Sequence, residues 1–257
     1  MKKAKKVLAL FLAAVMLVCT TVAATVAYLY SKTEVTTNTF TVGDVKIILN
    51  EADNGADEEF FATVDGKEVA IETLDVEYKH GEEDRDTRNG YHLLPNTTHA
   101  KDPMVSVRKD SEDSYIRMLV TVQNYDRLVA AFPDEYTVDG VFLLQNVVDW
   151  NEEPWAYFDC TINGTTAIYE FRYNGVYTVA EDAATVTVTG GKTGDAGEYV
   201  ELVPLFTEIT IPGSLVNEDI ALLSTVAIDV EAHAIQAEGF GTAEEAWAAF
   251  DAEGYNA

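Results

Sequence analysis

Short runs of β-branched and aromatic residues, separated by turn dipeptides that contain glycine, restrict the fold of this chain more than any other feature. Residues 61–64 and 67–71 are two such runs, and Asp65-Gly66 lies between them. An Asp-Gly dipeptide supplies both positive-φ positions of a tight hairpin turn. The pattern therefore predicts a β-hairpin and favours antiparallel pairing of neighbouring strands.

The same punctuation recurs in the second half of the chain. Asn163-Gly164 and Asn174-Gly175 separate three runs that predict an antiparallel meander, at residues 155–162, 165–173 and 176–180. Further strand regions are predicted at residues 115–122, 200–211 and 221–235. We find no internal repeat and no second domain, and we expect an all-β, jelly-roll-like antiparallel β-sandwich with short helices.

Two segments interrupt the strand pattern in the first half of the chain. Residues 125–132 predict a short helix that ends at Pro133. Residues 82–90 are rich in charge and lack apolar periodicity, so we expect a solvated loop.

A helix is predicted close to the C-terminus. Thr242 and Glu245 form a capping box, in which the two side chains satisfy backbone N–H groups of the first turn. Over residues 243–251, Trp247 and Phe250 recur at helical spacing with Ala243. We expect this helix to pack on the sandwich through Trp247 and Phe250.

The N-terminus has the organisation of a secretory signal peptide. Four lysines precede an apolar run and a segment of small residues, which is the usual order of such signals. Thr25 and Ala27 fit the small-residue rule for a cut between Ala27 and Tyr28, so residues 1–27 are predicted to be a signal helix and residues 28–257 one secreted domain. The alternative is a membrane anchor, since the apolar segment extended to Tyr30 could just span a bilayer. We expect the protein to contact a membrane only through this segment while it is uncleaved.

The charge and the cysteine count restrict the partners and the stabilising bonds. The first 27 residues hold four of the 17 basic residues and no acid, so the rest combines 13 basic with 44 acidic residues, a net charge of −31. Such a surface repels nucleic acids and anionic lipids.

After removal of Cys19, Cys160 is the one cysteine, so no internal disulfide forms. We interpret Cys160 as a small packing residue rather than a catalytic thiol.

Three separated motifs resemble one protein family. Val26-Ala-Tyr28 is followed by Ser-Lys-Thr-Glu and Asn-Thr-Phe-Thr-Val-Gly at residues 31–34 and 38–43. Leu94-Pro-Asn-Thr-Thr-His-Ala-Lys-Asp-Pro precedes Ser-Tyr-Ile-Arg at residues 114–117, and His-Ala-Ile-Gln-Ala-Glu-Gly-Phe at residues 233–240 precedes Ala246-Trp247. These stretches resemble the Gram-positive exported proteins that are processed by the alternate signal peptidase SipW, a family that includes TasA-like matrix proteins and camelysins. The resemblance covers the N-terminal third and the last 25 residues, whereas residues 124–200 match nothing specific.

The resemblance implies an extracellular jelly-roll domain, in a family whose members include subunits of biofilm-matrix fibres. In TasA-like fibres the segment after the cleavage site completes the sheet of the next subunit, a form of strand addition. Here that segment would be residues 28–40, in which the assembly residues are Thr33, Val35, Thr37, Thr39 and Phe40. The alternatives are an ordinary first strand of the same subunit and an unstructured leader. The implied partners are a SipW-like signal peptidase and further copies or related matrix proteins.

Enzymatic function is the competing hypothesis, because camelysins have been classed as metalloproteases. The four histidines are His80, His92, His99 and His233, and they form no His-Glu-x-x-His pair. His92 and His99 flank one turn and are the candidate zinc ligands, and acidic residues at 53, 57–59 and 82–86 are candidate calcium ligands. We expect a non-enzymatic protein without a cofactor, with a camelysin-like secreted metal-dependent protease as the alternative.

A carbohydrate-binding sandwich is a third hypothesis. It depends on exposure of Trp150, Trp155 and Tyr157, since exposed aromatic rings are what a sugar face would stack on. Aromatic residues in strands are more commonly core residues.

Overall fold

The computed structural model describes residues 45–53, 61–64, 67–70, 78–87, 89–91, 93–191 and 194–253. The predicted signal peptide, its cleavage site and the predicted assembly strand at residues 28–40 lie outside these residues. Residues 45–257 form one compact unit. Within the described residues no helix is both long and apolar enough to cross a membrane.

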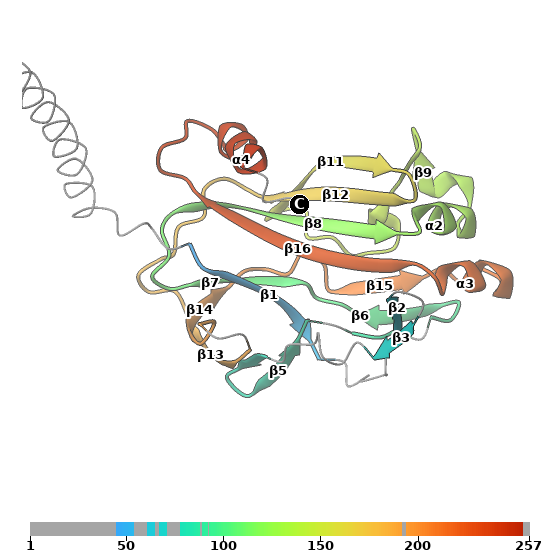
Figure 1. The fold of residues 1–257 in the computed structure, drawn as a ribbon, viewed down its shortest axis with the longest axis horizontal. Helices are drawn as coiled ribbons and strands as arrows, with labels where there is room; N and C mark the ends of the chain where they lie inside the picture. The colour runs from blue at the N-terminus through green and yellow to red at the C-terminus, as the bar shows by residue number, and fades with distance from the viewer. Residues whose placement is uncertain are drawn as a thin grey trace, which may run out of the picture. The chain divides into compact units, whose positions relative to one another are not determined.

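A four-stranded antiparallel sheet forms one layer of the molecule (Figure 1). Its order is β11 (Trp155–Asn163), β12 (Thr166–Tyr173), β8 (Ser114–Gln123) and β16 (Ala227–Gln236). The central strand β8 lies where apolar alternation predicted a strand, because every second side chain from Ile116 to Val122 is buried. The prediction of an all-β antiparallel fold is confirmed.

The facing layer is built around β1 (Ile47–Ala52), β7 (Met104–Arg108) and β14 (Gly197–Glu201). Three further strands close these into a six-strand ring in the order β1-β5-β4-β13-β14-β7. The added strands are β4 (Tyr78–His80), β5 (Glu83–Asp86) and β13 (Val186–Gly190). A short pair, β6 (Thr97–Ala100) with β15 (Glu208–Ile211), continues the line of β7 and β14.

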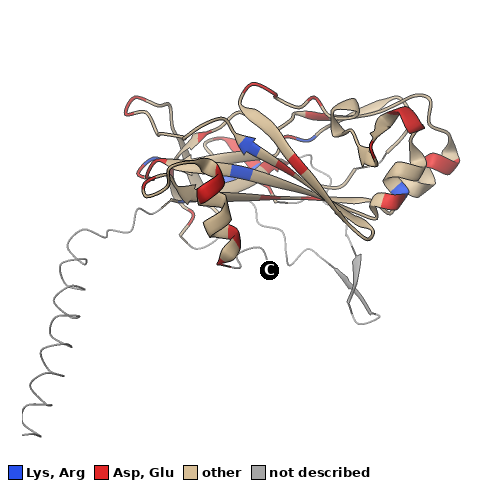
Figure 2. Ribbon diagram, turned by 90° about the horizontal axis from the view of Figure 1, so that it is seen from above, with Lys and Arg blue, Asp and Glu red and all other residues tan. Residues whose placement is uncertain are grey.

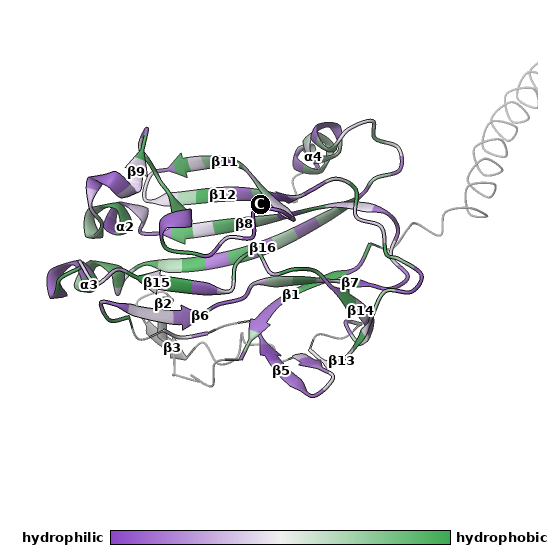
Figure 3. Cartoon of the chain, turned by 180° about the vertical axis from the view of Figure 1, so that it is seen from behind, coloured by the Kyte–Doolittle hydropathy of each residue, from purple (hydrophilic) through white to green (hydrophobic). Residues whose placement is uncertain are grey.

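The apolar core lies between the two layers. Val105 and Val107 of β7 face the buried side chains of β8 and β12, and Figure 3 shows hydrophobic positions on the strands of both layers. Successive side chains of β1 point to opposite faces, so Ile47 and Leu49 join this core. Ile48 instead enters a second apolar cluster inside the six-strand ring, with Tyr78, Val188 and Tyr199.

The described residues contain three α-helices. The helices α2 (Tyr125–Ala131) and α3 (Asn217–Leu223) lie together at one end of the layers, and α4 (Ala243–Ala252) lies by the four-stranded sheet (Figure 1). The predicted helix at residues 125–132 and its end before Pro133 are confirmed. Small hairpins complete the described elements: β2 (Phe61–Val64) with β3 (Lys67–Ala70), as predicted, and β9 (Thr137–Val138) with β10 (Val141–Phe142).

Two sequence predictions of strands were wrong in part. Residues 176–180 form no strand, because β8 already occupies the second edge of β12, and Tyr177 makes only an isolated bridge to Ser114. The predicted strand at 200–211 is divided into the end of β14 and β15, since the intervening Leu205 and Phe206 turn into the core.

Two further segments differ from the sequence predictions. Residues 221–235 begin in α3 rather than in a strand, because Asp219 caps that helix by accepting the Val216 N–H at 2.9 Å. The charged segment 82–90 is not wholly a loop: β5 pairs with both β1 and β4, and Arg85 is buried within the ring. That burial places charged side chains inside the six-strand ring.

Candidate functional site

A break between β6 and β7 positions an extended polar cluster within the described part of the chain. Lys101-Asp102-Pro103 separates the two strands, and Pro103 has no backbone N–H to continue a ladder. The Lys101 N–H still pairs with the carbonyl of Thr207 at 3.0 Å. The side chains of Lys101 and Asp102 thereby reach β1 and β5, so the Lys-Asp-Pro motif anchors the cluster, which we call the polar network.

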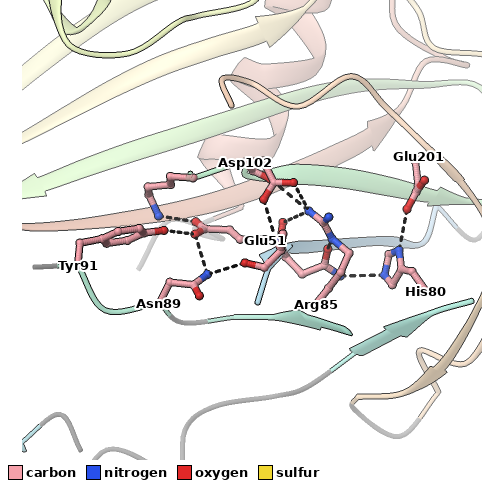
Figure 4. Close-up of polar contacts among 10 residues, drawn as sticks. Glu51, His80, Arg85, Asn89, Tyr91, Asp102 and Glu201 are labelled. Atoms are coloured by element: carbon pink, nitrogen blue, oxygen red, sulfur yellow. Dashed lines mark hydrogen bonds and ion pairs between the residues drawn. The ribbon is translucent and has the colours of Figure 1, made fainter. Parts of the chain in front are cut away.

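The first half of the polar network surrounds Glu51. Lys101 Nζ lies 2.5 Å from Glu51 Oε1, and both side chains are about nine-tenths buried, at 8% and 11% exposure. Glu51 Oε2 accepts hydrogen bonds from Asn89 Nδ2 at 3.3 Å and from the Tyr91 hydroxyl at 3.4 Å. Figure 4 shows Asn89 and Tyr91 directed at the Glu51 carboxylate. Burial, reinforced by Glu51, raises the pKa of Tyr91, so this hydroxyl stays a donor.

The second half is a chain of contacts across the ring interior. Arg85 donates from Nη2 to Asp102 Oδ2 at 3.0 Å and from Nε to Asn50 Oδ1 at 2.7 Å. Asn50 Nδ2 lies 3.0 Å from His80 Nε2, and His80 Nδ1 lies 2.9 Å from Glu201 Oε1. Arginine can only donate, so the Asn50 oxygen must face Arg85 and its amide nitrogen must face His80. His80 therefore accepts at Nε2 and donates its Nδ1–H to Glu201.

The contacts in this half of the polar network hold strands of the ring together. Both ring nitrogens of His80 are engaged, and the ring is 3% exposed. Ser106 pairs opposite Glu201, yet its buried hydroxyl has no hydrogen-bond partner, so it forms no serine–histidine pair with His80. The contacts join β1, β4, β5 and β14 to the Lys-Asp-Pro break.

The predicted metal ligands do not come together in the described part of the chain. His92 lies outside it, and His99 Nε2 contacts Thr97 Oγ1 at 2.9 Å while the ring packs edge-on against Tyr91. The acidic residues 57–59 also lie outside. No group of three or more histidine, cysteine or acidic side chains is arranged for a metal ion in the residues that the structure describes.

The three aromatic residues proposed for carbohydrate binding do not form one exposed face. Trp155 is fully buried and donates to the carbonyl of Val203 at 2.8 Å. Trp150 donates to the Trp155 carbonyl at 2.9 Å and packs against Phe171, whereas Tyr157 is 43% exposed. One exposed ring is not a stacking surface.

The predicted packing role of Cys160 fits its place beside the core, where burial raises the pKa of its thiol to about 11.

The outer edge of β11 is the second candidate site, and we call it the β11 edge. Among the described strands β11 pairs with β12 alone, and Figure 1 shows it at the border of its sheet. Large apolar side chains are exposed along it: Tyr157 at 43%, Phe158 at 50% and Ile162 at 43%. A bulge between Tyr157 and Asp159 interrupts the pairing, and the Arg172 guanidinium lies 3.3 Å from the centre of the Phe158 ring. An uncovered edge with apolar side chains is a template for another strand.

Sequence reasoning missed most of both sites. Lys101 and Asp102 entered only as part of a stretch that resembles a family motif, without a site role, and no signal indicated Glu51, Asn89 or Arg85. Comparison of the chain with protein-family models, with curated proteins and with solved structures gives no match.

Proposed function

We propose that this chain is an exported, non-enzymatic extracellular structural protein, whose copies assemble by adding a strand of one copy to the β11 edge of the next. The observation that supports this proposal is the β11 edge itself. The backbone groups on the side of β11 away from β12 have no strand partner among the described residues, and the apolar side chains of this edge are exposed to solvent. In strand addition the backbone hydrogen bonds supply affinity and alternate side chains supply specificity.

The segment proposed to occupy this edge is residues 28–40, which lie outside the described residues. Its sequence is rich in β-branched residues, which suit an extended strand, and Lys32 offsets Glu34. A segment without net charge escapes most of the repulsion that a strongly acidic body exerts on acidic partners. Residues 28–40 are therefore suited to bind a neighbouring copy despite the net charge of the domain.

Truncation tests this proposal. The chain that begins at Tyr28 should form filaments visible by electron microscopy when salt or divalent cations screen the charge, whose range is about 8 Å at physiological ionic strength. A chain that begins at Phe40 should stay monomeric by analytical ultracentrifugation and keep its circular dichroism spectrum. Filaments from the shorter chain, or its loss of folding, would show that residues 28–39 are not a donated strand.

The alternative function, a camelysin-like metal-dependent protease, has no supporting contact among the described residues. If the purified chain cleaved casein and a chelator abolished this cleavage, the result would support the protease alternative.

A further inference from the structure

The contacts around Glu51 bring a buried amine and a side-chain amide to one carboxylate. Lys101 Nζ lies 2.5 Å from Glu51 Oε1, and Asn89 Nδ2 lies 3.3 Å from Glu51 Oε2. We propose that Lys101 and Asn89 are joined by an intramolecular amide bond, for which Glu51 carries the proton. This inference is independent of the proposed assembly, since it concerns a bond within one copy.

The proposed nucleophile, the Lys101 amine, is withdrawn from solvent together with Glu51. The Lys101 and Glu51 side chains are 8% and 11% exposed, and lysine amines become nucleophiles when they are desolvated. In the proposed reaction the ammonium passes a proton to Glu51 Oε1, with which it is in contact, and this leaves a lone pair on Nζ and a neutral carboxylic acid. Tyr91, which donates to Oε2 and packs beside Lys101, helps to exclude water from the pair.

Asn89 supplies the electrophilic carbon and the leaving group. Its Nδ2 donates to the Ala52 carbonyl at 3.2 Å as well as to Glu51, so the amide nitrogen faces the group that can protonate it. Attack of Nζ on Cγ forms the new C–N bond, and Glu51 returns its proton to Nδ2. The Cγ–Nδ2 bond breaks and ammonia leaves. One of the two protons then on Nζ passes to the Glu51 carboxylate and on to solvent, and the other stays as the N–H of the new amide. No oxidant or other co-reactant is needed.

Proximity replaces an external catalyst in this reaction, because Lys101 Nζ and Asn89 Nδ2 both lie against the Glu51 carboxylate. Groups held close together react at effective concentrations far above those in solution. The terminal torsion of a glutamate is broad, so the Glu51 carboxylate can turn while it stays near both nitrogens. Lys101 belongs to the Lys-Asp-Pro break, and Asn89 follows β5 in the chain. The bond would tie these two segments covalently in a domain that has one cysteine and no internal disulfide.

Mass spectrometry of the full chain tests the proposal. The purified protein should weigh less than its sequence by one ammonia, apart from any removal of the signal, and a protease digest should contain one branched peptide that joins Lys101 to Asn89. Lys101→Arg and Glu51→Gln should both restore the full sequence mass, because the first removes the nucleophile and the second the proton carrier. Near-ultraviolet circular dichroism would establish that each variant is folded.

Two further variants make the test specific. Asn89→Asp should lose one water in place of ammonia, because the leaving group changes with the acceptor. Lys79→Arg is the matched control, since Lys79 makes an equally short contact to Asp84 but is 59% exposed, and it should leave the mass loss unchanged. A wild-type chain at its full sequence mass would overturn the proposal, and so would loss of water with a bond from Lys101 to Glu51.

Discussion

Arg117 shows how a single buried residue joins separate parts of this molecule. It lies on the outer face of β8, is 2% exposed, and donates from Nη2 to Asp251 Oδ1 at 2.6 Å. Its guanidinium also lies 4.4 Å from the ring of Trp247, and its Nε donates to His233 Nδ1 at 3.2 Å. A buried charge needs such partners, so Arg117 and Trp247 together explain why α4 docks on the sheet.

Trp247 is the residue whose removal should cost most at this contact. It is 2% exposed, as predicted from helical spacing, so Trp247→Ala should lower the free energy of unfolding by about 3–5 kcal/mol. Thr242→Ala should lower it by about 1 kcal/mol, because Thr242 Oγ1 accepts the Glu245 N–H. Urea unfolding measures both losses. An unchanged unfolding midpoint for Trp247→Ala would mean that α4 is not docked in solution.

Asp149 makes stability depend on pH at a residue that sequence patterns did not identify. Burial alone would raise its pKa, but hydrogen bonds from the Thr207 hydroxyl and from the N–H groups of Thr207 and Glu208 outweigh burial and lower it. A carboxylate with a lowered folded-state pKa stabilises the protein above its unfolded pKa, and the contribution is lost as pH falls through the folded pKa.

Asp149→Asn should therefore destabilise the protein at neutral pH and have a smaller effect in acid. Thermal unfolding of both chains across this pH range measures the difference, with Asp182→Asn as a control at an exposed turn. A difference that is constant with pH would contradict the assigned role.

At the scale of elements, the sequence predicted those that carry a local signal. The alternation from Ile116 to Val122 predicted β8, and the capping box predicted α4, although Glu245 accepts the N–H of Gly241 at 2.9 Å rather than that of Thr242. β5 was not predicted, because its charged residues become strand-forming only when β1 and β4 lie beside them. α3 was not predicted, since a short helix followed at once by a strand gives one mixed apolar pattern.

The β11 edge permits a prediction at the scale of one strand. Ile162→Lys should prevent assembly, because an edge lysine opposes the approach of another strand. Val176→Lys adds the same charge at a residue that is similarly exposed, at 45%, but lies outside β11, so it should leave assembly unchanged. Light scattering in screening salt compares the two variants, and equal loss of assembly in both would attribute the effect to charge rather than to the edge.

At the scale of the whole molecule, contacts between distant residues escaped prediction. His80 and Glu201 are 121 positions apart, and Lys101 and Glu51 are 50 apart. The local sequence around each of these residues does not indicate its partner, and only the closure of the six-strand ring brings the partners together. The Lys-Asp-Pro motif drew attention to one side of the polar network, whereas no local pattern indicates the other.

The overall charge bears on assembly at the same scale. Figure 2 shows acidic residues on all three helices of the described chain, and Asp126, Asp219 and Glu244 are among them. Repulsion between copies weakens with added salt, whereas backbone pairing is short-ranged and little affected. Assembly should therefore strengthen as ionic strength rises.

Amide hydrogen exchange tests the central claim, donation of a strand to the β11 edge, most directly. A folded chain that begins at Phe40 would be mixed with a synthetic peptide of residues 28–40, and exchange would be followed along the whole domain. The proposal predicts that the peptide slows exchange in β11, from Trp155 to Asn163, and that Ile162→Lys abolishes this protection. Binding without protection of β11, or protection confined to another strand, would contradict it.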